Sequence, residues 1–288
     1  MRLALCGLLA ISSAGIAQER PLPDKDAFTR EVRARLRTDD EAQRAYRYVE
    51  TRRDQRLDEA GRIAEETVKV IESYPGFPGE GRWERIIVEN GKPVPVPKLA
   101  SQDRERQQQA QEYARELARQ TDADRAKLAR EREQERRELE TTIDDAFRVF
   151  DFQMVRREMV NGHDTILVTM TPRPNAQPKT RIGRMVRSFH GRVWMSESDY
   201  EMVKLEVEAL KDVSFGMGLL ARVHKGTRLL FERRKVNDEA WLPARITYAA
   251  SARILLLRRL RVGRVSEYAD YRQFSVETST IYDVPSTR

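Results

Sequence analysis

Residues 202–208 read MVKLEVE, and apolar and charged side chains alternate along this stretch. Val203, Leu205 and Val207 point to one side of an extended chain, whereas Lys204 and Glu206 point to the other. This period of two predicts a β-strand with one apolar and one solvated face. The expected strands of this region are 192–196, 201–210, 219–224, 227–236, 241–252 and 262–275. Residues 191–274 are therefore predicted to form an antiparallel β-meander whose apolar face needs a cover.

Strands are also expected before the meander. Residues 150–160 and 164–171 are predicted to pair across Asn161-Gly162, because this dipeptide readily adopts the positive φ angles of a two-residue turn. Shorter strands are expected near 46–52, 63–73 and 83–89. Together these segments predict a sheet much larger than the meander alone.

Three short helices are predicted to cover the sheet. In residues 24–37, Phe28, Val32 and Leu36 recur at helical spacing and share one face. A second helix is expected to start at Thr38, where the spacing to Glu41 is that of a capping box. A third is expected at 181–189.

The most biased segment is 101–140, which holds 10 Lys and Arg and 11 Asp and Glu but no Gly or Pro. This composition predicts one long, solvated helix. Its apolar stripe, at 110–118, is too thin for a sustained coiled-coil seam. Two interpretations stay open: a helix that lies on or projects from the sheet, and a helix that binds a protein partner.

The first 17 residues have the pattern of a signal peptide. One positive charge precedes an apolar run, and the small residues Gly15 and Ala17 suit cleavage after Ala17. The run is shorter than the roughly 20 residues that span a bilayer. We therefore expect export to the periplasm or beyond, without a retained transmembrane helix.

The only cysteine is Cys6, which lies inside this expected signal. Leu5 precedes it where a lipoprotein signal needs a small residue, so lipidation is not expected. Cleavage would leave a mature chain that contains no disulfide. Its stability must then come from packing.

The formal net charge of +7 is unevenly distributed. Between Lys179 and Arg264 there are 19 Lys and Arg against 9 Asp and Glu. Such a surface suits anionic lipid head groups or an acidic partner, and a solvated basic face without a partner is the alternative. Nucleic acid is not expected, because the chain is predicted to be exported and lacks a basic and aromatic recognition motif.

No catalytic or metal-binding pattern is present in the sequence. The three histidines, His163, His190 and His224, have no second ligand at helical or strand spacing. The neighbouring carboxylates at 144–145 and 238–239 are more typical of helix caps and turns than of a hydrolytic pair. We therefore predict no enzymatic activity, no metal and no cofactor.

Two apolar segments are candidates for ligand contact. Residues 212–220 read DVSFGMGLL, in which glycines let an apolar segment bend and methionine adapts to irregular ligands. Residues 254–257, ILLL, lie beside Arg258, Arg259 and Arg261, a combination that suits an acyl chain with an anionic head group. A bulged core strand and a buried strand with a basic edge are the respective alternatives.

Three segments of the meander resemble a known family. GRVWM (191–195), DYEMVKLE (199–206) and NDEAWLPARI (237–246) are similar to the carboxy-terminal strands of bacterial outer-membrane lipoprotein-sorting proteins of the LolA and LolB type. The resemblance covers roughly residues 150–275. It implies an α+β fold in which a large antiparallel sheet curves into a half-barrel, is covered by short helices and holds lipid chains on its concave apolar face. The long charged helix is a departure from the family pattern.

The expected organisation is a signal peptide (1–17), helices and first strands (18–98), the charged helix (99–141) and the meander (142–284), with both sheet segments in one domain. The leading hypothesis is a non-enzymatic envelope carrier or sensor that binds lipid or lipoprotein acyl chains. The alternative is an envelope adaptor that binds a protein through residues 101–140. The lipid contacts expected are Trp194, Val203, Leu205, Phe215, Met217, Phe231 and Tyr248. Arg258, Arg259 and Arg261 are expected at the head group.

Overall fold

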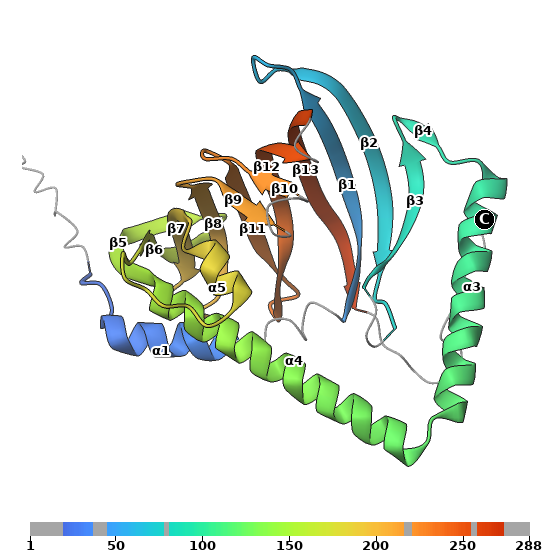
Figure 1. The fold of residues 1–288 in the computed structure, drawn as a ribbon, viewed down its shortest axis with the longest axis horizontal. Helices are drawn as coiled ribbons and strands as arrows, with labels where there is room; N and C mark the ends of the chain where they lie inside the picture. The colour runs from blue at the N-terminus through green and yellow to red at the C-terminus, as the bar shows by residue number, and fades with distance from the viewer. Residues whose placement is uncertain (1–19, 37–44, 78–80, 216–220, 255–257, 274–288) are drawn as a thin grey trace, which may run out of the picture.

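The computed structural model describes residues 20–36, 45–77, 81–215, 221–254 and 258–273. These residues form one antiparallel sheet of 13 strands that curves strongly around its own axis (Figure 1). The main path runs in the order β4-β3-β2-β1-β13-β12-β11-β8-β7-β6-β5, and β9 and β10 form a side branch on β12. β4 and β5 stand at the two ends, and the described residues do not pair them with each other. The predicted α+β half-barrel is confirmed.

The bounds of the elements follow the chain. The strands are β1 (Tyr46–Leu57), β2 (Ile63–Tyr74), β3 (Trp83–Glu89), β4 (Lys92–Pro93), β5 (Phe150–Val160), β6 (His163–Pro172), β7 (Phe189–Ser196), β8 (Met202–Ala209), β9 (Val213–Phe215), β10 (Ala221–Val223), β11 (Arg228–Val236), β12 (Ala240–Ile254) and β13 (Arg258–Gln273). The helices are α1 (Lys25–Arg35), α3 (Val96–Arg119), α4 (Asp122–Val149) and α5 (Arg181–Val186). The expected signal peptide and the helix predicted from Thr38 lie outside the described residues.

The hairpin of β5 and β6 is confirmed. Val160 pairs with His163, and the intervening Asn161 and Gly162 have φ angles of 51° and 81°. These are the left-handed values that an Asn-Gly turn between two strands requires. Sequence alone therefore sets this register.

One side of the sheet faces the helices, and we call it the inner face. Residues directly opposite each other in neighbouring strands share a face. The ladder Val193, Leu205, Phe231, Ile246 and Ser266 therefore marks the inner face from β7 to β13. Arg52 of β1 lies opposite Ser266 and is therefore also on the inner face.

α1 and the end of α4 pack on the inner face because each has one apolar side. α1 begins at Asp24, whose side chain accepts a hydrogen bond from the Ala27 N–H, and it buries Phe28 and Val32. The last turns of α4 bury Ile143 and Val149. A core cluster joins these helices to β5, β6 and β7.

The single long helix predicted over 101–140 is wrong in its extent. Two helices occupy this region, and the non-helical residues Gln120 and Thr121 separate them. Thr121 and Asp124 form a capping box, in which each side chain accepts a hydrogen bond from the other residue's backbone. The pattern TDAD at 121–124 contains this start signal, but helix propensity alone does not reveal it.

α3 lies along β3 and covers that edge of the sheet (Figure 1). The Gln102 side chain accepts a hydrogen bond from the Ile86 N–H at 3.0 Å and donates to the Ile86 carbonyl at 3.1 Å. It thus replaces a strand partner at an edge that would otherwise be open. Arg85 pairs with Asp103 through two hydrogen bonds of 2.7 and 3.1 Å, and Arg106 stacks on Phe77 at 3.8 Å.

Candidate functional site: an apolar cavity under three helices

A cavity of about 440 Å³ lies between the inner face and the helices α1, α4 and α5. Its walls come from five strands and its roof from the three helices. The wall residues are Phe150, Phe152, Met154, Val168, Met170, Phe189, Val193, Met195, Met202, Leu205, Val207 and Leu229. The roof residues are Lys25, Phe28, Thr29, Val32, Leu36, Ala146, Phe147, Met185 and Val186.

The lining is apolar and adaptable. Only Lys25 and Thr29 among the lining residues carry polar side chains. Five of the eight methionines of the chain line the cavity, and methionine side chains adjust to irregular apolar shapes. The volume lies within the range of roughly 300–1,000 Å³ that is usual for small-molecule sites.

A buried carboxylate holds the roof together. Asp145 of α4 is fully buried and accepts hydrogen bonds from the Lys179 N–H at 3.0 Å, the Thr180 N–H at 2.6 Å and the Thr180 hydroxyl at 2.7 Å. Thr180 is the residue that caps α5. Arg148 adds an ion pair at 2.5 Å. Asp145 therefore fixes the start of α5 against α4.

The environment of Asp145 also determines its charge. Burial by itself raises the pKa of a carboxyl group, but the hydrogen bonds from Lys179 and Thr180 outweigh burial and hold the pKa of Asp145 below its ordinary value of 3.8. Gly183 of α5 lies so close that an added Cβ would approach the Asp145 Oδ2 to 2.5 Å. The close approach of the two helices depends on this glycine.

α1 is held to α4 by a second, more exposed contact. Arg33 forms an ion pair with Asp144, and its guanidinium lies 5.4 Å from the centre of the Phe147 ring. Phe28 packs edge to face against Tyr200 with ring centres 5.5 Å apart. The roof thus has a buried joint at α5 and a half-exposed joint at α1.

The opposite half of the inner face carries charged side chains on β13, β1 and β3. Arg52 bridges Glu50 and Glu84, each at 2.7 Å, and Arg264 pairs with Asp54 at 2.5 Å. Hydrogen bonds to Glu50 and Glu84 raise the pKa of Arg52 above its ordinary value. Here charged side chains on β13, β1 and β3 satisfy one another.

Tyrosines gather at one end of this charged half. The rings of Tyr48 and Tyr268 lie 5.3 Å apart, and those of Tyr48 and Tyr271 lie 5.4 Å apart. The Arg82 guanidinium stacks 4.4 Å from the Tyr48 ring. Burial raises the pKa of Tyr268 and of Tyr271 above the ordinary value of 10. Tyr268 and Tyr271 are therefore neutral packing groups.

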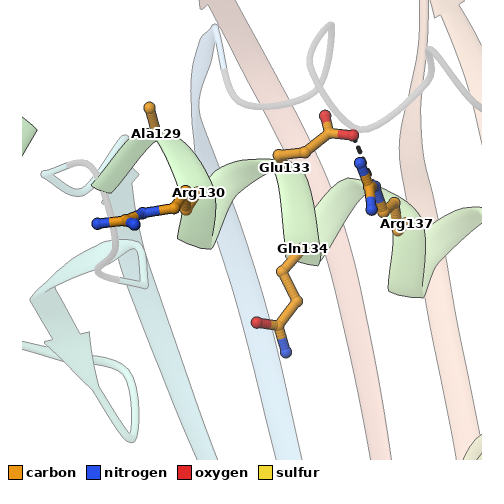
Figure 2. Close-up of a pocket in the computed structure, with 5 residues that line it drawn as sticks. All are labelled: Ala129, Arg130, Glu133, Gln134 and Arg137. Carbon is orange, nitrogen blue, oxygen red and sulfur yellow. Dashed lines mark hydrogen bonds and ion pairs between the residues drawn. The ribbon is translucent and has the colours of Figure 1, made fainter. Parts of the chain in front are cut away.

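Another hollow lies on α4 itself. Figure 2 shows its residues, Ala129, Arg130, Glu133, Gln134 and Arg137, which all come from one helix. Glu133 and Arg137 form an ion pair at 2.8 Å. Because no second element forms an opposite wall, this hollow does not enclose a ligand.

The expected lipid contacts lie in different places. Leu205 is on the cavity wall. Phe231 and Tyr248 are on the inner face just beyond the wall, opposite Leu205 and Leu229 respectively. Val203 is fully buried beside the lining residues of β8.

Trp194 lies on the other side of the sheet, between the inward residues Val193 and Met195 of β7. Its indole Nε1 donates to Glu158 at 2.5 Å, and the Lys204 ammonium lies 4.6 Å from the ring centre. Leu205 and Trp194 therefore lie on opposite faces of the sheet.

The remaining expected contacts are less fully described. Phe215 ends β9, but its side chain and Met217 lie outside the described structure, as do the side chains of Arg258 and Arg259. Arg261 donates to the Asp58 carbonyl at 3.4 Å, at the turn between β1 and β2.

The helices supply cavity residues that the sequence-based list omitted. Phe28, Val32 and Leu36 come from the apolar stripe of α1, and Met185 and Val186 come from that of α5. The helical spacing of both stripes is visible in the sequence. The sequence does not show which part of the sheet these stripes cover.

The described residues contain no group of three or more His, Cys, Asp or Glu placed to hold a metal ion. None of their helices combines the length and the apolar character needed to span a bilayer.

No protein-family model and no curated protein sequence match this chain. Solved structures give low-scoring similarities. A domain described as an outer membrane lipoprotein-sorting protein, from Vibrio parahaemolyticus, has a TM-score of 0.34 at 11% identity and covers 88% of this chain and 93% of its own. A LolA superfamily protein from Nitrosomonas europaea has a TM-score of 0.31 at 11% identity, with coverages of 86% and 94%. A complex of MucA and MucB from Pseudomonas aeruginosa has a TM-score of 0.24 at 10% identity, with coverages of 85% and 99%.

Proposed function

We propose that this chain is an exported, non-enzymatic binding protein whose cavity holds the alkyl chain of a lipid or of a lipidated protein. The observation that carries the proposal is the apolar lining of a cavity of about 440 Å³. Burial of an alkyl chain contributes roughly 0.8 kcal/mol per methylene group. A lining with almost no polar groups offers little to a ligand that needs hydrogen bonds.

The proposal assigns roles to the residues at the site. Leu205 contacts the alkyl chain directly, and Phe231 and Tyr248 extend the apolar wall along the inner face. Lys25 is the one charged residue of the lining, and it suits an anionic group at the end of the chain. Contact of Arg258 and Arg259 with the head group is part of the same proposal.

The test is native mass spectrometry of the protein purified from a bacterial periplasm without detergent, followed by organic extraction. The expected result is a bound lipid at close to one per chain that is released on heating. Leu205→Asp, which places a charge on the cavity wall, should lose that lipid. Glu206→Asp is the matched control, because Glu206 is the next residue on β8 and points to the other face. An apo mass with no lipid uptake would contradict the proposal.

A second candidate function rests on the exposure of the two long helices. Most side chains between residues 114 and 139 are exposed, and ion pairs such as Glu133 with Arg136 lie along one helix. A protein partner could dock on this surface, which would make the chain an envelope adaptor.

Replacing residues 115–138 with a Gly/Ser linker of equal length separates the two functions. Such a linker has a typical end-to-end distance of about 27 Å and a much longer maximum reach, so α3 and the end of α4 can keep their places. A carrier should keep its lipid after this change. An adaptor should lose the protein that co-purifies with the wild type and keep its fold, which circular dichroism would check.

A further inference from the structure

The two ends of the sheet are treated differently. At one end, α3 and the Gln102 side chain cover β3. At the other end, β5 pairs with β6 alone in the part of the chain that the structure describes. An edge strand without a partner presents free N–H and C=O groups that can pair with another strand. β5 is therefore the place to look for an interaction.

The side chains of β5 make this edge unusual. Val155 is 44% exposed and Met159 is 73% exposed, so this edge strand presents two large apolar side chains to solvent. Edge strands usually carry charged residues or proline that discourage pairing. Between these apolar residues lie Arg156 and Glu158, of opposite charge, with Arg157 at the centre.

We propose that β5 pairs in an antiparallel direction with β5 of a second copy of this chain, about a two-fold axis at Arg157. In this register Val155 of one copy lies opposite Met159 of the other, and Arg156 lies opposite Glu158. Both pairings occur twice, as a two-fold interface requires. Each exposed apolar residue gains an apolar neighbour. Arg156 and Glu158 already form an ion pair within one strand, and in the dimer each also lies opposite the other residue of the second copy.

The centre of the interface brings two Arg157 side chains together. Each already pairs with Glu197 at 2.7 Å and donates to the Pro21 carbonyl at 3.0 Å. Hydrogen bonds from Arg157 hold the pKa of Glu197 below its ordinary value, so the pair stays ionised at neutral pH. Each Arg157 is paired with a carboxylate and points to the inner face. The two arginines therefore do not prevent the two strands from forming backbone hydrogen bonds.

The length of the pairing sets its strength. The register of β5 with β6 shifts between Met154 and Arg156, and such bulges bend a strand. Pairing should therefore extend over about five residues of each copy, which buries less than the roughly 1,200 Å² typical of stable complexes. The dimer is accordingly weak and concentration-dependent, and it joins two cavities through one continuous sheet.

Disulfide trapping tests the register. In a Cys6→Ser background the double variant Val155→Cys/Met159→Cys should form an interchain disulfide under mild oxidation. Opposed residues of an antiparallel pair lie about 4.5–5.5 Å apart, within the range that a disulfide bridges. Within one chain the two positions are separated by about 13 Å. In each single cysteine variant the two cysteines of a dimer would also lie more than about 13 Å apart, too far for a disulfide. The single variants should therefore not cross-link.

Sedimentation supplies an independent readout. The wild type should show a monomer–dimer equilibrium between micromolar and submillimolar concentrations. Val155→Lys/Met159→Lys, at exposed positions that leave the fold intact by circular dichroism, should be monomeric throughout. The proposal is overturned if the wild type is monomeric at every concentration, if the lysine variant still dimerises, or if single and double cysteine variants cross-link equally. None of these results depends on whether the cavity holds a lipid.

Discussion

The two halves of the inner face differ in the character of their side chains and in whether helices cover them. From β5 to β8, and on to Leu229 of β11, its side chains are apolar and three helices cover them. On β13 and β1 many are charged: Arg52 pairs with Glu50 along β1, and Arg264 pairs with Asp54 across the two strands. A charged ladder needs no cover, whereas an apolar wall does. The roof therefore lies over one half only, and the cavity lies beneath it.

α4 repeats this division along its own length. Its last turns bury Ile143, Asp145 and Val149, whereas most side chains between 122 and 139 are exposed. The exposed part is held by ion pairs within the helix, such as Arg136 with Glu140 at 2.6 Å. Only the part that covers the apolar half carries buried residues.

The largest expected effect is on the roof of the apolar half. Asp145→Ala leaves the buried N–H groups of Lys179 and Thr180 without their acceptor, which should lower the free energy of unfolding by about 2–4 kcal/mol. It should also weaken ligand binding, because α5 is no longer fixed to α4. Urea denaturation monitored by circular dichroism measures the first effect.

Asp144→Ala is the matched control for that experiment. Asp144 is the preceding residue, and its ion pair with Arg33 is half exposed, so its removal should cost at most about 1 kcal/mol. Equal losses from the two variants would contradict the role given to Asp145.

Acid should weaken the contact that Asp145 makes with Lys179 and Thr180. The folded pKa of Asp145 is held below the ordinary value of 3.8, so the unfolded chain takes up a proton first as the pH falls. The stability from Asp145 is therefore present above about pH 4 and is lost as the pH falls through its folded pKa. Thermal unfolding of wild type and Asp145→Asn between pH 5 and 2.5 measures this, and the variant should lose less stability over that interval. A parallel decline of the two proteins would contradict it.

The charged half should respond more weakly and without any effect on the ligand. Glu50 is only 3% exposed, and Glu50→Gln weakens its contact with Arg52 at a cost of about 1–2 kcal/mol. Glu267 pairs with Arg53 on the outer face, where both side chains are well exposed, so Glu267→Gln should cost at most about 0.5 kcal/mol. Urea denaturation gives both values. Loss of bound lipid from Glu50→Gln would contradict the expectation that the charged half has no part in ligand binding.

The sequence predicts much of this sheet. Alternation in MVKLEVE gives β8, Asn161-Gly162 gives the hairpin of β5 and β6, and the spacing of Phe28 and Val32 gives α1, because each signal is local. Two of the three segments of the family resemblance also meet in space, since the Trp241 indole donates to Asp199 at 2.9 Å.

The site was harder to predict because it depends on long-range placement. Trp194 was expected inside, but the parity of β7 makes Val193 and Met195 the inward residues. Arg233 belongs to the basic meander, yet it is fully buried and donates to the Trp241 carbonyl at 2.5 Å. The ladder of Arg52 and Glu84 joins residues that are distant in sequence. No local pattern shows which charges meet.

If the apolar half holds an alkyl chain, a large side chain that fills the cavity should weaken its binding. Ala146 faces the cavity from α4, and Ala129 is exposed on the same helix (Figure 2). The measurement is a titration of wild type, Ala146→Phe and Ala129→Phe with a fluorescent fatty acid. Wild type and Ala129→Phe should bind the fatty acid saturably. Ala146→Phe should bind it at least tenfold more weakly, a loss of about 1.4 kcal/mol of binding free energy. Equal binding by all three proteins would contradict it.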